Sequence, residues 1–284
     1  MATTSEFVID ANTVALYHMN GTVGSAGKRD NAEGTPGRDL TEVGTLTSAT
    51  GNIVVTTDGA YQSASGASNY ITFTPGMGTG AFTVEGWVYA SAYTLGEVLI
   101  SSFNLTNYYQ IAVDSSDNTR LRIEVNPSDG VTTGYITAPS TGTWHYLAVT
   151  YDRSGSNSVK VYLNGSPVTY TIIGGTNSRT GTMTDGLTRL FRNSGGSGVT
   201  NTYRFDELRF SNTARSASEI FAYYNDPVSS SPESLVIASF IPVPAPQTIV
   251  ITSTVNPVTI TTKENIWTND TQTATPTWVN DTQS

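Results

Sequence analysis

The chain has 284 residues, of which 13% are charged and none is cysteine, and its formal net charge is −9 at pH 7. The negative charge disfavours a nucleic-acid partner, because an acidic surface repels a phosphate backbone. The lack of cysteine excludes disulfides, thiol catalysis and cysteine-ligated metals. No stretch approaches the roughly 20 apolar residues that a membrane-spanning helix needs, so membrane insertion is not expected.

Three regions follow one another along the chain: a polar arm at 1–13, a region of strand-like runs at 14–226 and a tail at 227–284. In the middle region, short apolar runs alternate with turn signals such as Asn164-Gly165, which is typical of hairpins in a sandwich or barrel. We predict strands over residues 14–18, 70–74, 82–90, 97–103, 108–114, 120–126, 144–152, 159–164, 168–173 and 203–211.

The run at 82–90 shows which of its sides is apolar. Because side chains alternate along a strand, Phe82, Val84 and Val88 share one face. Glu85 and Trp87 share the other face. We expect Trp87 to fill the core, as a large apolar ring normally does.

One short helix is predicted at about 216–224. Ser216 and Glu219 have the spacing of a capping box, in which the two side chains bond each other's backbone amides. The apolar turns that follow contain Ile220, Phe221 and Tyr224.

The tail at 227–284 has a different character. Its dense prolines exclude a central sheet strand. Trp267 and Trp278 begin two similar polar repeats, and an indole in a polar segment gains little unless it docks on a partner. We therefore predict that both tryptophans act in assembly, with a disordered tail as the alternative.

Four motifs, taken in order, resemble the laminin G-like, concanavalin A-like jelly-roll family. They lie at 82–88, 144–152, 159–165 and 205–220. The resemblance implies an all-β fold, a two-sheet antiparallel jelly-roll sandwich with one short helix. It also implies a binding or adhesion module, often for glycans and sometimes with bound calcium. The tryptophan repeats are similar to those at the ends of some bacteriophage structural proteins.

These features together favour a non-catalytic adhesion or virion structural protein, such as a capsid decoration or tail protein, that presents the jelly roll to host-surface glycans. We expect it to be a homo-oligomer whose tail contacts other virion or surface-assembly subunits. The N-terminal residues lack an export-signal pattern, which favours the virion over an extracellular or cell-surface location. Three alternatives remain open: a bacterial carbohydrate-binding module, a decoration protein without a ligand, and a glycoside hydrolase.

The residues give little support to catalysis. A retaining glycosidase needs two carboxylates about 5 Å apart on one face. Asp206 and Glu207 are adjacent and are expected to point to opposite faces of a strand. His18 and His145 have no zinc-site spacing. We therefore predict no catalytic residues.

The candidate ligand-binding residues are aromatic. Tyr108, Tyr109 and Tyr135 flank predicted turns, where their rings are placed to stack on sugars. Trp144 is expected in the core.

One calcium ion is the only cofactor that the sequence suggests. Calcium prefers oxygen ligands, including Asp carboxylates. Asp30 lies in the loop after the first predicted strand, and Asp206 lies near the end of the sandwich. The two ends of such a domain usually meet, so we propose that these carboxylates share the ion.

Overall fold

A computed structural model describes residues 7–19, 28–29, 38–51, 59–66, 68–103, 106–193 and 195–225. The chain divides into two units, Met1–Ser234 and Leu235–Ser284, and every described residue lies in the first. In the described part of the chain, no helix is long and apolar enough to cross a membrane.

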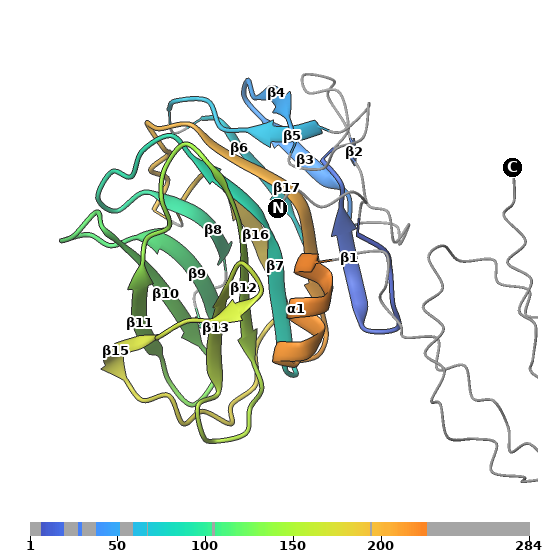
Figure 1. Ribbon diagram of the computed structural model, residues 1–284, viewed down its shortest axis with the longest axis vertical. Helices are drawn as coiled ribbons and strands as arrows, with labels where there is room; N and C mark the ends of the chain where they lie inside the picture. Colours follow the sequence, from blue (N-terminus) through green and yellow to red (C-terminus); the bar gives the residue numbers. More distant parts are fainter. Residues whose placement is uncertain are drawn as a thin grey trace, which may run out of the picture. The chain divides into compact units, whose positions relative to one another are not determined.

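The described strands form the two antiparallel sheets of a jelly-roll sandwich, as predicted (Figure 1). In these residues one sheet has eight strands: β14 (Ser166–Pro167), β13 (Val159–Leu163), β12 (Trp144–Tyr151), β7 (Phe82–Ala90), β17 (Tyr203–Ser211), β5 (Gly59–Gln62) and β4 (Thr47–Thr50) in order, with β1 (Thr13–Tyr17) also paired to β17. The other has nine: β15 (Thr171–Gly175), β11 (Thr132–Thr137), β10 (Arg120–Asn126), β9 (Tyr108–Val113), β8 (Val98–Phe103), β16 (Leu187–Leu190), β6 (Tyr70–Phe73), β3 (Leu40–Val43) and β2 (Lys28–Arg29).

The strands predicted at 82–90, 120–126 and 203–211 have the same bounds in the structure. The run predicted at 168–173 becomes a strand only from Thr171. Seven of the described strands were not predicted: β2, β3, β4, β5, β11, β14 and β16. Most of them are four residues long and several contain threonine or glycine, so they lack a long apolar alternation.

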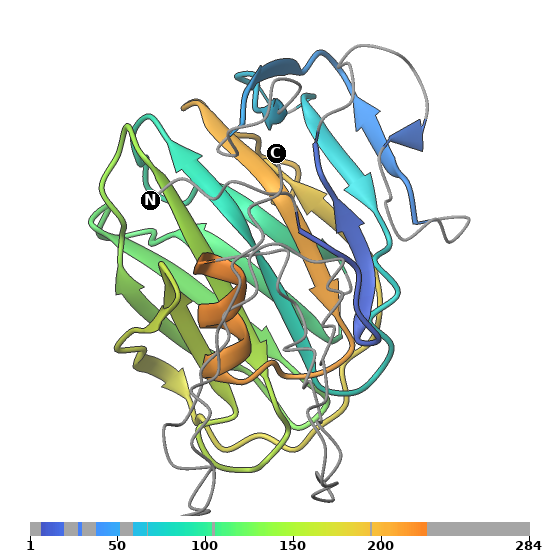
Figure 2. The same ribbon diagram turned by 45° about the vertical axis from the view of Figure 1, so that its right-hand side comes forward.

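The two faces of β7 bury against different partners. Phe82, Val84 and Val88 face the core between the sheets, as predicted. Trp87 is also buried, but it belongs to a second apolar cluster with Tyr146 and other residues on the outer face of the eight-stranded sheet. The helix α1 (Ala217–Asn225) lies over this face (Figure 2). Trp87 is therefore buried by the helix layer rather than between the sheets.

The helix begins with the predicted capping box. The Glu219 carboxylate accepts the backbone N–H of Ser216 at 2.7 Å, and the Ser216 hydroxyl accepts the N–H of Glu219 at 3.3 Å. Ile220 and Tyr223 are the buried helix residues, whereas Phe221 is 54% exposed. Of the apolar residues of the predicted turns, Phe221 therefore lies on the solvent side of the helix.

A β-bulge interrupts the alternation of β17. Asp206 pairs with Trp87 and Arg209 pairs with Glu85, so the residues between them oppose a single residue of β7. Glu207 has a φ of 50°, and its carboxylate accepts the backbone N–H of Phe7 at 2.7 Å. Strict alternation therefore does not decide the direction of this side chain.

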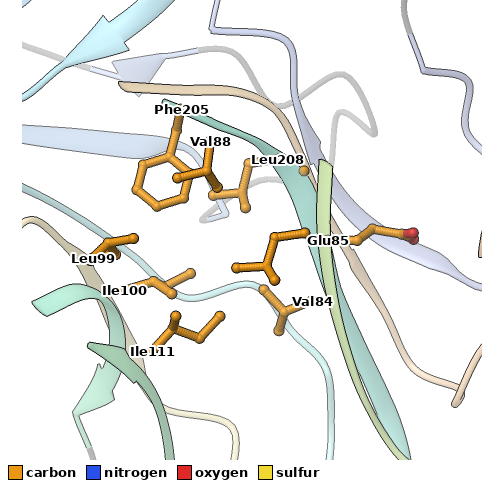
Figure 3. A pocket seen from close by; sticks show the side chains of 10 residues that line it. Val84, Glu85, Val88, Leu99, Ile100, Ile111, Phe205 and Leu208 are labelled. Atoms are coloured by element: carbon orange, nitrogen blue, oxygen red, sulfur yellow. The ribbon is translucent and has the colours of Figure 1, made fainter. Parts of the chain in front are cut away.

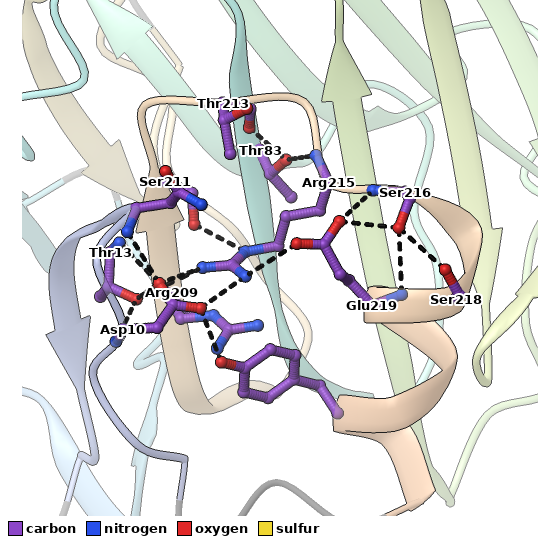
Figure 4. Close-up of polar contacts among 12 residues, drawn as sticks. Asp10, Thr13, Thr83, Arg209, Ser211, Thr213, Arg215, Ser216, Ser218 and Glu219 are labelled. Carbon is purple, nitrogen blue, oxygen red and sulfur yellow. Dashed lines mark hydrogen bonds and ion pairs between the residues drawn. The ribbon is translucent and has the colours of Figure 1, made fainter. Parts of the chain in front are cut away.

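Buried charges join both ends of the domain on this outer face (Figure 4). The Arg215 guanidinium donates to both carboxylate oxygens of Asp10, at 2.7 and 2.8 Å. The Tyr223 hydroxyl donates to the same carboxylate at 2.8 Å. The segment before β1 is thereby tied to α1, which closes the eight-stranded sheet on its outer side.

Candidate functional site

A polar row crosses the outer face of the nine-stranded sheet. Successive cross-strand pairs bring together Thr133, Glu124, Gln110, Ser101, Arg189, Thr72 and Thr41 on β11, β10, β9, β8, β16, β6 and β3. For six of these residues a neighbour on the same strand belongs to the sandwich core, which indicates that the row lies on the opposite face of the sheet. Ser101 is nevertheless buried, at 2% exposure. At a strand spacing of about 4.8 Å, the polar row extends over about 30 Å.

Arg122 organises the centre of the polar row. Its guanidinium donates to Gln110 Oε1 at 3.4 Å and lies 3.8 Å from Glu124 Oε1. The Arg122 and Glu124 side chains are 27% and 15% exposed, so solvent still reaches both. The Nε–H of Arg122 has no hydrogen-bond partner. The Nε atom itself is buried, so the centre offers a ligand the partly exposed carboxylate of Glu124 and the neighbouring amide of Gln110 and guanidinium of Arg122.

Two of the three predicted platform tyrosines lie on this face. Tyr108 pairs with Asn126, two residues from Glu124 on β10. Tyr135 pairs with Arg122, two residues from Glu124 in the other direction. Both rings are half-buried on strands, not on turns. Tyr108 and Tyr135 therefore lie on opposite sides of Glu124, along a diagonal that crosses β10.

Tyr109 points the other way. It is 3% exposed, packs on Phe82 at 5.5 Å between ring centroids, and shares a 2.8 Å hydrogen bond with Thr188. Its ring belongs to the core between the sheets. The expectation that adjacent tyrosines both serve as platforms fails for Tyr109, because the residues alternate between the two faces of β9.

The electrostatics of this face keep Tyr108 neutral. Burial raises the pKa of Tyr108, and the charge of Glu124 raises it further, against a smaller opposing effect of Arg122. A neutral phenol offers an O–H donor and an oxygen acceptor beside an apolar ring. This combination suits a ligand with hydroxyl groups at its edge and C–H groups on its face.

The predicted calcium site is described only in part. Asp206 is fully buried on β17, and Asp30 lies outside the described residues. In the described ranges, no group of three or more His, Cys, Asp or Glu side chains is placed to hold a metal ion. The shared calcium ion stays a prediction, as do the roles of Trp267 and Trp278, which also lie outside the described residues.

His145 takes part in a serine–histidine–asparagine arrangement that the sequence did not suggest. Its Nε2 lies 3.1 Å from Ser140 Oγ, and its Nδ1 lies 3.3 Å from Asn164 Nδ2. Asn164 Oδ1 accepts the N–H of Tyr146 at 3.0 Å, which turns the amide nitrogen toward Nδ1.

This amide orientation assigns the proton of His145 to Nε2, because Nδ1 must accept. Nε2 then donates to the Ser140 carbonyl oxygen, 3.0 Å away. A general base needs an unprotonated nitrogen facing the hydroxyl that it activates. The hydrogen bonds of His145 thus favour a role in holding the turn before β12.

A small cavity lies inside the core and offers no second site (Figure 3). Its lining is apolar apart from Glu85, and the figure shows the Glu85 carboxylate pointing away from it. The cavity adjoins Gly86 and Leu208, at the bulge between β7 and β17.

Sequence reasoning missed Gln110, Glu124 and Arg189. The alternation of Arg120, Arg122 and Glu124 with apolar residues is visible in the sequence of β10. That pattern indicates only a solvent-facing side, however, and charges on such a side are usually solvated. The register of seven strands was needed to place these residues in one row.

A family model described as the concanavalin A-like lectin/glucanases superfamily matches residues 65–221. None of the curated proteins matches the chain. The matched range contains most of the polar row, α1 as far as Phe221, and all three candidate tyrosines.

Several solved structures share this fold. The receptor-binding domain of a botulinum neurotoxin C/D mosaic serotype is 12% identical, with a TM-score of 0.55 over 76% of this chain and 51% of that one. A botulinum neurotoxin type C structure, whose cell entry is described as dependent upon interaction with two ganglioside molecules, is 11% identical, with a TM-score of 0.55 over 75% and 50% of the two chains. This chain thus spans about half the length of those toxin domains.

Domain 4 of AbnA, a GH43 extracellular arabinanase from Geobacillus stearothermophilus in complex with arabinotriose, is also similar. It is 19% identical, with a TM-score of 0.55, and the match covers 78% of this chain and 100% of that domain. At these identities the likeness shows the fold.

Proposed function

Because the chain belongs to the concanavalin A-like lectin/glucanases superfamily, we propose that it is a non-catalytic module that binds an oligosaccharide across the outer face of its nine-stranded sheet. The observation that carries this proposal is the polar row, with Tyr108 and Tyr135 on either side of Glu124. Arginine, carboxylate and amide groups recognise vicinal hydroxyls through paired hydrogen bonds, and the tyrosine rings pack on the C–H faces of sugars.

The length of the polar row favours an oligosaccharide over a single sugar. Tyr108 and Tyr135 are two strands and four residues apart, which places them roughly 16 Å from each other. A chain of several sugar rings spans this distance and passes Glu124 on the way. The ligands named for the toxin and arabinanase neighbours belong to those proteins, and they indicate which class of probe to test first.

The non-catalytic part of the proposal is supported by the composition of this face. The polar row contains one carboxylate, Glu124, which already lies beside Arg122. Glycoside hydrolysis with retention or inversion requires two carboxyl groups across the scissile bond. The expected result is binding without turnover, and cleavage of a bound glycan that Glu124→Gln abolishes would contradict it.

The binding test compares single variants by calorimetric titration with a panel of neutral oligosaccharides that includes arabinotriose. We expect Tyr108→Ala and Glu124→Gln each to weaken the binding of the best probe about tenfold or more, a loss of about 1.4 kcal/mol. Phe221→Ala is the matched control, because it removes an exposed aromatic ring from α1. If wild type and the three variants bind the probe with equal affinity, or if no neutral probe binds, the proposal of a binding site on this face is wrong.

The role in assembly that we expect of the tail, in a virion or at a cell surface, also stays a proposal. Residues 227–284, with Trp267 and Trp278, lie outside the described residues. The binding face proposed here does not depend on them.

A further inference from the structure

A second row of side chains crosses the opposite side of the molecule, on the outer face of the eight-stranded sheet. We call it the aromatic row, and it consists of Trp144, Tyr89, Arg204, Gln62 and Thr47 on β12, β7, β17, β5 and β4. Its member Tyr89 lies two residues along β7 from Trp87, which packs in the apolar cluster beneath α1. Trp144 is only partly buried, so the expectation that it fills the core was wrong.

Contacts along the aromatic row hold its side chains in one arrangement. The rings of Trp144 and Tyr89 lie 5.8 Å apart, and the guanidinium carbon of Arg204 lies 4.5 Å from the Tyr89 ring centroid. Arg204 Nε donates to Gln62 Oε1 at 2.7 Å, and Gln62 Nε2 donates to Thr47 Oγ1 at 3.0 Å. The amide thus orients the guanidinium over the tyrosine ring, which lowers the ordering cost of binding.

Among the described residues, the charge of Arg204 has no close counter-charge. On the same face, Arg209 is paired with Glu85 at 2.6 Å and Arg215 with Asp10 at 2.7 Å. For Arg204, no carboxylate in the described part of the chain lies within 4.0 Å. In a protein of net charge −9, this is a local positive site next to two aromatic rings.

We propose that the aromatic row binds a carboxylated sugar residue of an acidic glycan. The sugar ring packs on Trp144 and Tyr89, and its carboxylate accepts from the guanidinium N–H groups of Arg204 that Gln62 leaves free. A guanidinium presents a planar pair of donors that fits a carboxylate, and this pairing supplies the charge complementarity. An uncharged sugar retains only the ring contacts.

The proposal predicts a preference between matched probes. Trigalacturonate is compared with galactotriose, and sialyllactose with lactose, by calorimetric titration of the full chain. We expect at least one acidic probe to bind about tenfold or more tightly than its neutral partner. The pair that shows the preference identifies the acidic sugar as a uronate or a sialate. Equal affinity within both pairs, or no binding of either acidic probe, would overturn the proposal.

Variants assign the binding to this row. Arg204→Gln keeps a partner for Gln62 but removes the charge, and we expect a loss of about tenfold or more for the acidic probe, with no change for the neutral one. Arg204→Lys keeps the charge without the planar donor pair, so an intermediate affinity is expected. If Arg204→Gln does not fold, Tyr89→Leu removes the platform instead. Unchanged acidic-probe affinity in the folded variants would contradict the site.

Tyr108→Ala separates this proposal from the binding face on the other sheet. It should leave the acidic probe unaffected, whereas Arg204→Gln should leave the neutral oligosaccharides unaffected. Loss of the acidic probe in Tyr108→Ala would instead place all glycan binding on the nine-stranded sheet. If the neutral probes do not bind but an acidic probe does, the binding site proposed on the nine-stranded sheet is wrong, whereas the acidic-sugar site on the aromatic row still stands.

Discussion

Glu85 and Arg209 are charged residues without solvent contact, both 0% exposed at the side chain. The Glu85 carboxylate accepts hydrogen bonds from two N–H groups of Arg209, at 2.6 and 2.8 Å, and from the Tyr146 hydroxyl. It also lies 3.1 Å from Arg215 Nε. The Arg209 guanidinium also lies 3.3 Å from the ring centroid of Tyr223. Burial raises the pKa of the Tyr146 hydroxyl well above its usual value, and the charge of Glu85 adds to this, so Tyr146 acts as a stable donor. Each buried charge is therefore stabilised by several partners at once.

Removing one partner should be costly. Arg209→Met leaves Glu85 with one guanidinium fewer in a buried site, and we expect the free energy of unfolding to fall by about 3–5 kcal/mol. Denaturant titration measures this change. Lys160→Met is the control, because it breaks an exposed pair with Asp152 and should cost less than about 1 kcal/mol. Similar small losses in both variants would show that the buried cluster contributes little.

The segment before β1 and the helix α1 depend on each other. Phe7 packs against Tyr146 and Tyr223, with ring centroids 5.9 and 5.7 Å apart. Asp10 joins the two elements through Arg215 and Tyr223. Burial raises the pKa of Asp10, but the hydrogen bonds from Arg215 and Tyr223 and the charge of Arg215 outweigh it. The net pKa therefore lies well below the ordinary value of 3.8.

This lowered pKa makes the docking of the two elements dependent on pH. A carboxyl whose folded pKa is depressed stabilises the folded state fully above its unfolded value of 3.8, and this stabilisation declines as the pH falls below 3.8 toward the folded value. Asp10→Asn should therefore be less stable than wild type at about pH 7, with a smaller difference at about pH 2.5. Thermal or denaturant unfolding of both proteins at the two pH values measures it. Wild type and Asp10→Asn contain the same other carboxyl groups. A stability difference between them that does not change with pH would therefore contradict the lowered pKa of Asp10.

At the scale of the whole molecule, both ends of the described chain close the same sheet. β1 pairs with β17, and α1 covers the outer face that these strands share with β7. Ile220 and Tyr223 are buried at 0% and 3% exposure. Within the described residues, the buried positions of the sandwich thus extend to Tyr223, near the end of α1 at Asn225.

This boundary predicts how shortened chains behave. A chain that ends at Asp226 should stay folded and melt cooperatively near the wild-type temperature, because every described contact is retained. A chain that ends at Thr213 lacks α1 and should lose the second apolar cluster, with a large drop in melting temperature. Calorimetry and size-exclusion chromatography provide the comparison. If the chain ending at Asp226 does not fold, residues beyond 226 belong to the core.

Much of the fold was readable from local patterns. The alternation in 82–90 and 120–126 and the capping box at Ser216 involve residues a few positions apart, so these patterns are visible in the sequence itself. The all-β class and the single short helix follow from such patterns. The role of Tyr108 and Tyr135 in ligand binding stays a prediction, and the structure places both half-buried rings on strands of one face.

Only the tertiary structure decided which residues meet. The polar row, the aromatic row and the Glu85–Arg209 pair, 124 positions apart, depend on the register between strands. The bulge at Glu207 shifts that register by an amount that no local pattern predicts. The position of α1 buries Trp87 and leaves Trp144 partly exposed, although both are tryptophans in apolar strands. A side chain's alternation is a property of its own strand, whereas its neighbours across the sheet are set by how strands far apart in sequence align.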